Sequence, residues 1–209
     1  MKILIADDHP IVRHGLKQML AGQIDITAFG EASNAREVFE NLSTQDWDIL
    51  ILDISMPDRS GLDILGELKS LCPKLPVLIL SVHPEELYAI RVLKAGAAGY
   101  MTKLCVPEEL VKAVKKVVEG GKYISSSLTD RIALNLVAGF EKRPHEALSD
   151  REYRVAFMIA SGKNLKVIAK ELSLSVKTVR AYRASIFEKM KVKSNPELIR
   201  YALKNRLID

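Results

Sequence analysis

The segment ILILDISMP, residues 49–57, joins four consecutive apolar residues to Asp53 and Pro57. A short apolar run that ends in a turn signal is typical of a strand covered on both faces of a sheet. Strand-like and amphipathic segments alternate over residues 1–121, which predicts an α/β fold: a five-stranded parallel (βα)5 sheet wrapped by helices. The predicted strands are Lys2–Ala6, Ile26–Ala32, Ile49–Leu52, Val77–Ser81 and Gly99–Met101, and the predicted helices are Ile11–Leu20, Ala35–Leu42, Leu62–Leu71, Leu87–Leu93 and Leu110–Val118.

A different organisation follows Gly120-Gly121, a usual helix stop signal. Residues 122–144 are predicted to form a linker that contains one helix, about Leu128–Phe140. Residues 145–209 are predicted to form an all-α unit, in which Ser149 and Glu152 have the spacing of a capping box. Its four predicted helices are Asp150–Ser161, Leu165–Leu172, Val176–Met190 and Pro196–Lys204.

Charge is distributed unevenly along the 209 residues, whose net charge is +5. Residues 1–143 carry 17 Lys and Arg against 19 Asp and Glu, whereas residues 144–209 carry 14 against 7. The basic final third favours nucleic acid or another polyanion as a partner. No apolar run approaches the length of about 20 residues that spans a membrane, and no secretory signal is present, so we expect a cytoplasmic protein without a membrane partner. Cys72 and Cys105 fit no metal or disulfide pattern.

Acidic residues follow two of the predicted strands. Asp7 and Asp8 come directly after the first strand, and Asp53 comes directly after the third. The carboxyl ends of parallel strands lie on one edge of a sheet, so these carboxylates should converge. Their mutual repulsion would be relieved by a divalent cation, and Mg²⁺ prefers such oxygen ligands. A carboxylate can also act as a nucleophile, so Asp53 is a candidate phosphoacceptor.

Two further polar residues occupy the ends of later strands. Ser81 ends the fourth strand and Lys103 follows the fifth, where a hydroxyl and an ammonium could hold a phosphoryl group. Each residue also has a simpler interpretation: Asp7 and Asp8 could cap the helix at Pro10, Asp53 could be a turn aspartate, Ser81 a strand-end serine and Lys103 a surface lysine. Their joint position at consecutive strand ends favours a phosphoryl site.

The segment Ile168–Val179 has the pattern of a helix, a tight turn and a second helix. A shared core is predicted from Ile168, Leu172, Leu174, Val179 and Ile186. The outer face of the second helix carries Lys177, Arg180, Ala181 and Ala184, flanked by Tyr182 and Arg183. A helix of this kind fits the major groove of DNA. The alternative is a basic, solvated helix in an interaction domain.

The segments IADDH (5–9), LDISMP (52–57), Gly61-Leu62, Leu80-Ser81 and GAAGYMTK (96–103) resemble the receiver domain of two-component response regulators over about residues 1–120. The resemblance implies that Asp53 is phosphorylated, that Ser81 and Tyr100 are switch residues, and that His83 modulates dephosphorylation. Leu104 departs from the family, which often has proline or a polar residue there. The implied Mg²⁺ ligands are Asp8 and Asp53 directly, Asp7 through water, and the main-chain carbonyl of Ser55.

Residues 145–209 resemble the LuxR/FixJ-type output domain, through motifs that include LSDRE (148–152), IAKEL (168–172) and KTVR (177–180). The whole chain is therefore similar to regulators of the NarL/FixJ class. Tyr153-Arg154 and Tyr182 depart from the usual residues. The resemblance implies DNA contacts from Lys177, Thr178, Arg180, Tyr182 and Arg183.

The implied function is a DNA-binding regulator that accepts a phosphoryl group from a sensor histidine kinase. Phosphorylation would control homodimer formation, binding to a double-stranded DNA operator and transcription, with RNA polymerase as a further candidate partner. We expect no enzymatic activity beyond self-phosphorylation and self-dephosphorylation.

Three alternatives compete with this interpretation. A haloacid-dehalogenase-like phosphatase needs an acid two residues after its nucleophile, where this chain has Ser55. A dinucleotide-binding enzyme needs a glycine-rich loop after the first strand, which the sequence lacks. A receiver that works without phosphate, as a protein-binding module, stays open.

Overall fold

The computed structural model describes residues 1–56, 59–82, 85–125, 128–129, 144–205 and 207–208. The chain forms two compact units, Met1–Leu134 and Asn135–Asp209. None of the helices in these described ranges combines the length and apolarity that crossing a membrane requires.

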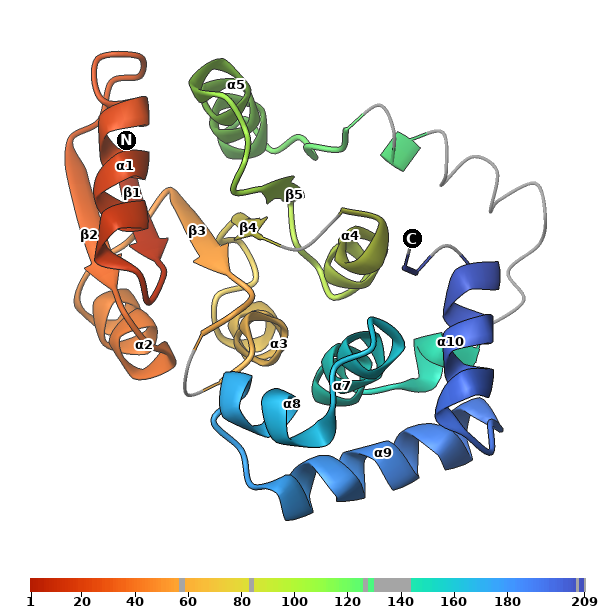
Figure 1. Cartoon of the computed structure of the whole chain (residues 1–209). Coiled ribbons are helices and arrows are strands. Elements are labelled where there is room, and N and C mark those ends of the chain that lie inside the picture. The colour runs from red at the N-terminus through yellow and green to blue at the C-terminus, as the bar shows by residue number, and fades with distance from the viewer. Residues whose placement is uncertain (57–58, 83–84, 126–127, 130–143, 206, 209) are drawn as a thin grey trace. The chain divides into compact units, whose positions relative to one another are not determined.

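The first unit contains a five-stranded parallel sheet in the order β2-β1-β3-β4-β5 (Figure 1). The order reverses between β1 and β3, and in such sheets the crevice at the carboxyl ends of the two strands is where ligands bind. The prediction of a five-stranded parallel sheet is confirmed, although the second strand begins two residues later than expected. The strands are β1 Lys2–Ala6, β2 Ala28–Ala32, β3 Ile49–Asp53, β4 Val77–Ser81 and β5 Gly99–Thr102.

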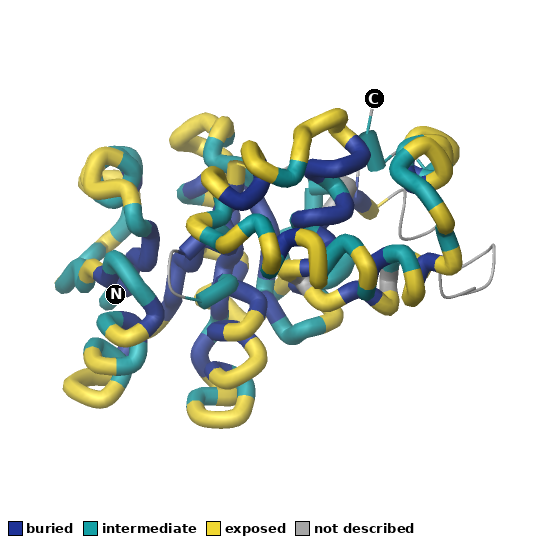
Figure 2. Tube along the Cα trace, turned by 60° about the horizontal axis from the view of Figure 1, so that its bottom comes forward, coloured by how far each residue is buried: buried dark blue, intermediate teal, exposed yellow. Residues whose placement is uncertain are grey.

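Helices cover both faces of this sheet. On one face, α1 and α5 pack through Leu16, Leu20, Leu110 and Val114 against apolar strand residues, while α2, α3 and α4 lie on the other face (Figure 1). Figure 2 shows the result: the central strands are buried and the outer sides of the helices are exposed. The bounds are α1 Pro10–Leu20, α2 Ala35–Thr44, α3 Gly61–Leu71, α4 Glu85–Lys94 and α5 Pro107–Val118.

The second unit is helical, as predicted. Ile168, Val179 and Ile186 are buried in its core, whereas Leu172 and Leu174, which flank the turn between two helices, are only half-buried. The predicted capping box is present. Of the predicted linker helix, residues 130–140 lie outside the described residues. The elements are η1 Pro144–Ala147, α7 Asp150–Ala160, α8 Leu165–Glu171, α9 Val176–Met190 and α10 Asn195–Lys204.

Candidate functional site

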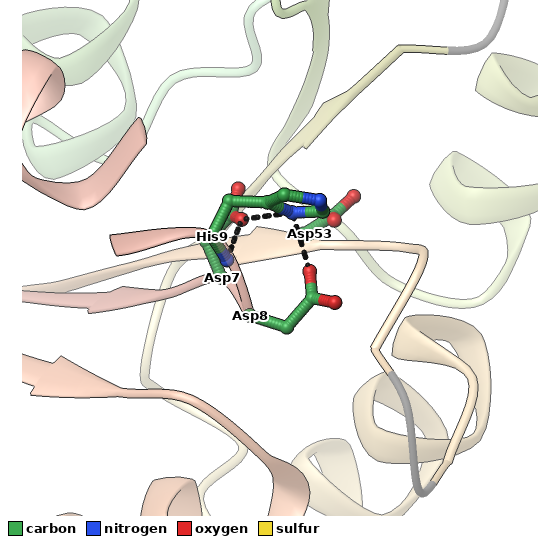
Figure 3. Close-up of side chains that lie close together, drawn as sticks. All are labelled: Asp7, Asp8, His9 and Asp53. Carbon is green, nitrogen blue, oxygen red and sulfur yellow. Dashed lines mark hydrogen bonds and ion pairs between the residues drawn. The ribbon is translucent and has the colours of Figure 1, made fainter. Parts of the chain in front are cut away.

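Three carboxylates meet at the carboxyl edge of the sheet, at the point where the strand order reverses. Asp7 and Asp8 follow β1, and Asp53 is the last residue of the neighbouring strand β3. One potential ligand atom from each of Asp7, Asp8, His9 and Asp53 lies within 4.8 Å of the others (Figure 3). The structure therefore brings together the acids that the sequence predicted to converge.

Lys103 links the acids of two strands. Its ammonium forms ion pairs with both Asp7 and Asp53, the second at 2.9 Å from Asp53 Oδ2. Its main-chain N–H donates to the carbonyl oxygen of Ser81 at 2.7 Å, which ties the residue to the end of β4. The lysine thus reaches the acids from the loop after β5, as predicted.

Burial and neighbouring charges shift the pKa values of Asp53 and Lys103 in opposite directions. Burial raises the pKa of Asp53, and the charge of Lys103 and a hydrogen bond from the Ser55 N–H offset this only in part. Burial alone would lower the pKa of Lys103, but the hydrogen bonds and negative charges of Asp7 and Asp53 outweigh it and raise that pKa. The lysine therefore stays charged while it compensates the acids.

The loop after β3 is packed tightly around Asp53. The Ser55 N–H donates to Asp53 Oδ1 at 3.0 Å, and the Gly61 N–H donates to the Ile54 carbonyl at 2.9 Å. A Cβ added to Gly61 would lie 2.4 Å from the main-chain oxygen of Asp53 and 2.7 Å from Ile54 Cα. Only glycine allows α3 to begin this close to the backbone of the candidate phosphoacceptor.

The predicted switch residues are both buried. Ser81 ends β4 and is paired in register with Thr102 of β5, while Tyr100 is paired with Ile79. Both side chains are inaccessible to solvent, with exposed fractions of 0% and 1%. Leu104, the departure after the lysine, is 90% exposed. His83 lies outside the described residues.

His9 belongs to the cluster but was missed in the sequence. Its Nδ1 lies 2.7 Å from Asp8 Oδ1 and 3.2 Å from Asp7 Oδ1, and its N–H donates to Asp7 Oδ1 at 2.9 Å. His9 is also the N-cap of α1, without a side-chain capping bond, so neither acid caps this helix. Its position directly after two acids was the signal that could have identified it.

The donor set fits a hard divalent cation. Carboxylate oxygens from Asp7, Asp8 and Asp53 face one another, and Mg²⁺ prefers oxygen ligands. Asp8 Oδ1 is buried, and no described residue gives it a well-aligned hydrogen bond. His9 Nδ1 lies 2.7 Å from this oxygen, and a cation would further compensate the charge of the buried carboxylate.

The predicted DNA-binding residues differ in their surroundings. Lys177 and Arg180 are exposed on α9, and Thr178 Oγ1 lies 2.8 Å from Ser175 Oγ at the N-terminus of this helix. Tyr182 is half-buried. Arg183 makes internal contacts, because its Nε donates to Asn195 Oδ1 at 2.9 Å and its guanidinium lies 4.7 Å from the centre of the Phe187 ring.

Both units match known protein families. Residues 3–115 match the response regulator receiver domain, and residues 146–202 match the bacterial regulatory proteins of the luxR family. The chain is a response regulator. Its two domains place the regulator in the NarL/FixJ class and make it a DNA-binding member of a two-component system.

The regulator has relatives of matching length. It is 38% identical over 216 residues to the oxygen regulatory protein NreC of Staphylococcus carnosus, and 37% identical over 217 residues to NreC of Staphylococcus epidermidis, in each case across both entire chains. RcsB of Salmonella enterica serovar Typhimurium, solved bound to promoter P1flhDC, shares 30% identity with a TM-score of 0.60, covering 96% of the regulator and 97% of that chain. Another structure, of two RcsB dimers bound to two parallel DNAs, has the same TM-score and coverage at 28% identity.

Proposed function

We propose that this regulator accepts a phosphoryl group on Asp53 from a sensor histidine kinase. The observation that carries the proposal is the bridge of Lys103 between Asp7 and Asp53, because it gathers three strand ends around one carboxylate. An oxygen of Asp53 forms a bond to phosphorus as the bond between phosphorus and the donor imidazole breaks. Lys103 compensates the charge that arrives with the phosphoryl group.

Asp8, Asp53 and the main-chain carbonyl of Ser55 are the proposed direct ligands of Mg²⁺, with Asp7 acting through water. When bound, the cation offsets the charge of the carboxylates and of the incoming phosphoryl group. Ser55 also holds Asp53 in place, since its N–H donates to Oδ1. The raised pKa of Asp53 supports this assignment, because a buried anion in this position benefits from a compensating cation.

Phosphorylation then shifts a conformational equilibrium. Hydrogen bonds to a charged group contribute about 1.5–3 kcal/mol each. Ser81, Lys103 and main-chain donors can supply two or three of them, and a shift from 1:99 to 99:1 needs about 5.5 kcal/mol. Movement of Ser81 and Tyr100 would transmit the change to the surface. Beyond self-phosphorylation and self-dephosphorylation, we propose no enzymatic activity.

The output of the switch is proposed to be dimer formation and binding to a double-stranded operator. The RcsB complexes with DNA support DNA binding as the output. The proposed contacts come from Lys177, Thr178, Arg180, Tyr182 and Arg183. We assign residues 1–121 to the receiver, 122–144 to the linker and 145–209 to the DNA-binding domain. A regulator of chromosomal operators would act in the cytoplasm, and RNA polymerase is a candidate contact there.

Incubation with acetyl phosphate and Mg²⁺, followed by intact mass measurement, tests the phosphoacceptor. The wild-type chain should gain one phosphoryl group, and Asp53→Asn should gain none. Asp46→Asn is the matched control, since this exposed aspartate precedes β3 at the opposite end of the strand. An unmodified wild-type chain would favour a receiver that works without phosphate, and a modified Asp53→Asn variant would contradict the assignment.

A further inference from the structure

We propose that Arg13 is a positioning residue that holds Asp7 and Asp8 in the conformation that binds the divalent cation. This inference rests on the proposed function, because it concerns the same site. Arg13 lies on α1, four residues after His9, and its side chain is only 14% exposed.

The guanidinium of Arg13 makes two directed contacts. Its Nη1 donates to the main-chain oxygen of Asp7 at 2.7 Å, and its Nε donates to Glu31 Oε2 at 2.7 Å. Glu31 belongs to β2, the neighbour of β1, and also pairs with the Lys17 ammonium. One side chain therefore joins α1, the end of β1 and β2.

The peptide that Arg13 holds is the one that connects Asp7 to Asp8. On the other side of Asp7, its N–H donates to the carbonyl of Ala32 in β2 at 3.0 Å. Asp7 is thus held by hydrogen bonds at both its N–H and its carbonyl. Rotation of the peptide between Asp7 and Asp8 would move both carboxylates, so the Arg13 contact restricts the geometry of the acid pair.

Arginine suits this position better than lysine. Its planar guanidinium presents donors in a fixed arrangement, so one residue can serve an acceptor just after β1 and another in β2. Hydrogen bonds from Lys17 and Arg13 lower the pKa of Glu31, so this carboxylate stays ionised and orients the guanidinium. Arg13 acts on the site through Asp7, in the way that outer residues orient the ligands of metal centres.

Calorimetric titration of the full chain with Mg²⁺ tests the inference. Loss of an outer residue typically weakens metal affinity about 10–100-fold, and we expect Arg13→Ala to fall near the lower end, about 10-fold. Arg13→Lys should also weaken binding, because the single nitrogen of lysine does not reproduce the separate Nε and Nη1 positions that reach Glu31 and Asp7. At saturating Mg²⁺, the rate of phosphorylation of Arg13→Ala by acetyl phosphate should recover toward the wild-type rate.

Val38→Ala is the matched control for a general loss of stability. Val38 is fully buried on α2, so its truncation lowers the melting temperature through a cavity in the same unit. This variant should bind Mg²⁺ as the wild type does. The inference would be overturned if either Arg13→Ala or Arg13→Lys bound Mg²⁺ with wild-type affinity. It would also be overturned if Val38→Ala lost as much Mg²⁺ affinity as Arg13→Ala. A wild-type chain that does not bind Mg²⁺ would instead contradict the proposed function, and this inference with it.

Discussion

At the scale of single residues, Gly61 determines how closely α3 approaches Asp53, the proposed phosphoacceptor. A methyl group there would meet main-chain atoms of Asp53 and Ile54, which cannot move as a flexible side chain can. We expect Gly61→Ala to lower the free energy of unfolding by about 1–3 kcal/mol, as overpacking does, and to slow phosphorylation by acetyl phosphate. Thermal unfolding and intact mass measure the two effects.

Gly66 provides the control within the same helix. A Cβ at Gly66 would meet nothing within 4 Å, and the residue lies inside α3. Gly66→Ala should therefore stabilise the chain by about 0.5–1 kcal/mol, because alanine favours the helix. Equal phosphorylation rates in Gly61→Ala and in the wild type would show that the close packing does not matter for the site.

At the scale of elements, a buried carboxylate joins α7 to α9. Glu152 accepts hydrogen bonds from the Ser149 N–H at 2.7 Å, from Ser185 Oγ at 2.5 Å and from Lys189 Nζ at 2.7 Å. Burial raises the pKa of Glu152, but these hydrogen bonds outweigh it and lower the pKa to about 2. The ionised form therefore stabilises the fold.

The lowered pKa predicts a pH dependence of stability. Because the folded pKa lies below the unfolded value of 4.5, the stabilisation is complete above about pH 4.5 and is lost as the pH falls through about 2. Its size is on the order of 3 kcal/mol. Glu152→Gln should lose most of this at pH 7 and differ little from the wild type near pH 2, as measured by urea unfolding followed by circular dichroism.

Glu171→Gln is the control for this prediction. Glu171 pairs with Lys163 at the surface, where ion pairs contribute about 0–1 kcal/mol, so its loss should change stability little at either pH. A Glu152→Gln variant as stable as the wild type at pH 7 would rule out the stabilising role of the carboxylate.

The helix α9 provides a second prediction at this scale. Arg180 is exposed on the face proposed to enter the major groove. Arg180→Ala should weaken operator binding by about 1–3 kcal/mol, measured by a gel-shift titration at fixed salt on a fragment recovered by genomic footprinting. Arg36→Ala on α2 removes the same charge from a side chain that is 83% exposed and should leave binding unchanged. Equal affinities of Arg180→Ala and Arg36→Ala would contradict the placement of α9.

At the scale of the whole molecule, the two domains should respond to one phosphoryl group. Treatment of the wild-type chain with acetyl phosphate and Mg²⁺ should increase the dimer fraction in light scattering and tighten operator binding. A full population shift corresponds to about 5.5 kcal/mol. Asp53→Asn should show neither change, and a variant that still dimerises on treatment would separate dimer formation from phosphorylation.

The sequence predicts the elements of the fold from local patterns, whereas the contacts of some site residues depend on tertiary packing. The apolar runs, the helical spacing and the Ser149–Glu152 capping box are local patterns, and they placed most elements within two or three residues of their observed ends. The sequence predicts the convergence of Asp7, Asp8, Asp53 and Lys103 because parallel strands share one carboxyl edge. Arg183 shows the limit, since its contacts with Asn195 and Phe187 depend on how α9 packs against its neighbours.

The sequence by itself determined the alternating strands and helices, the basic final third and the acids at the strand ends, since each of these follows from the order of neighbouring residues. The tertiary structure decided that Lys103 reaches Asp53, 50 residues away, and that Arg13 connects Asp7 to Glu31. The Arg13 contacts exist because β1 pairs with β2, and Lys103 reaches Asp53 because β4 alone separates β3 from β5. Strand order is set by long-range pairing, and no local pattern in the sequence encodes it.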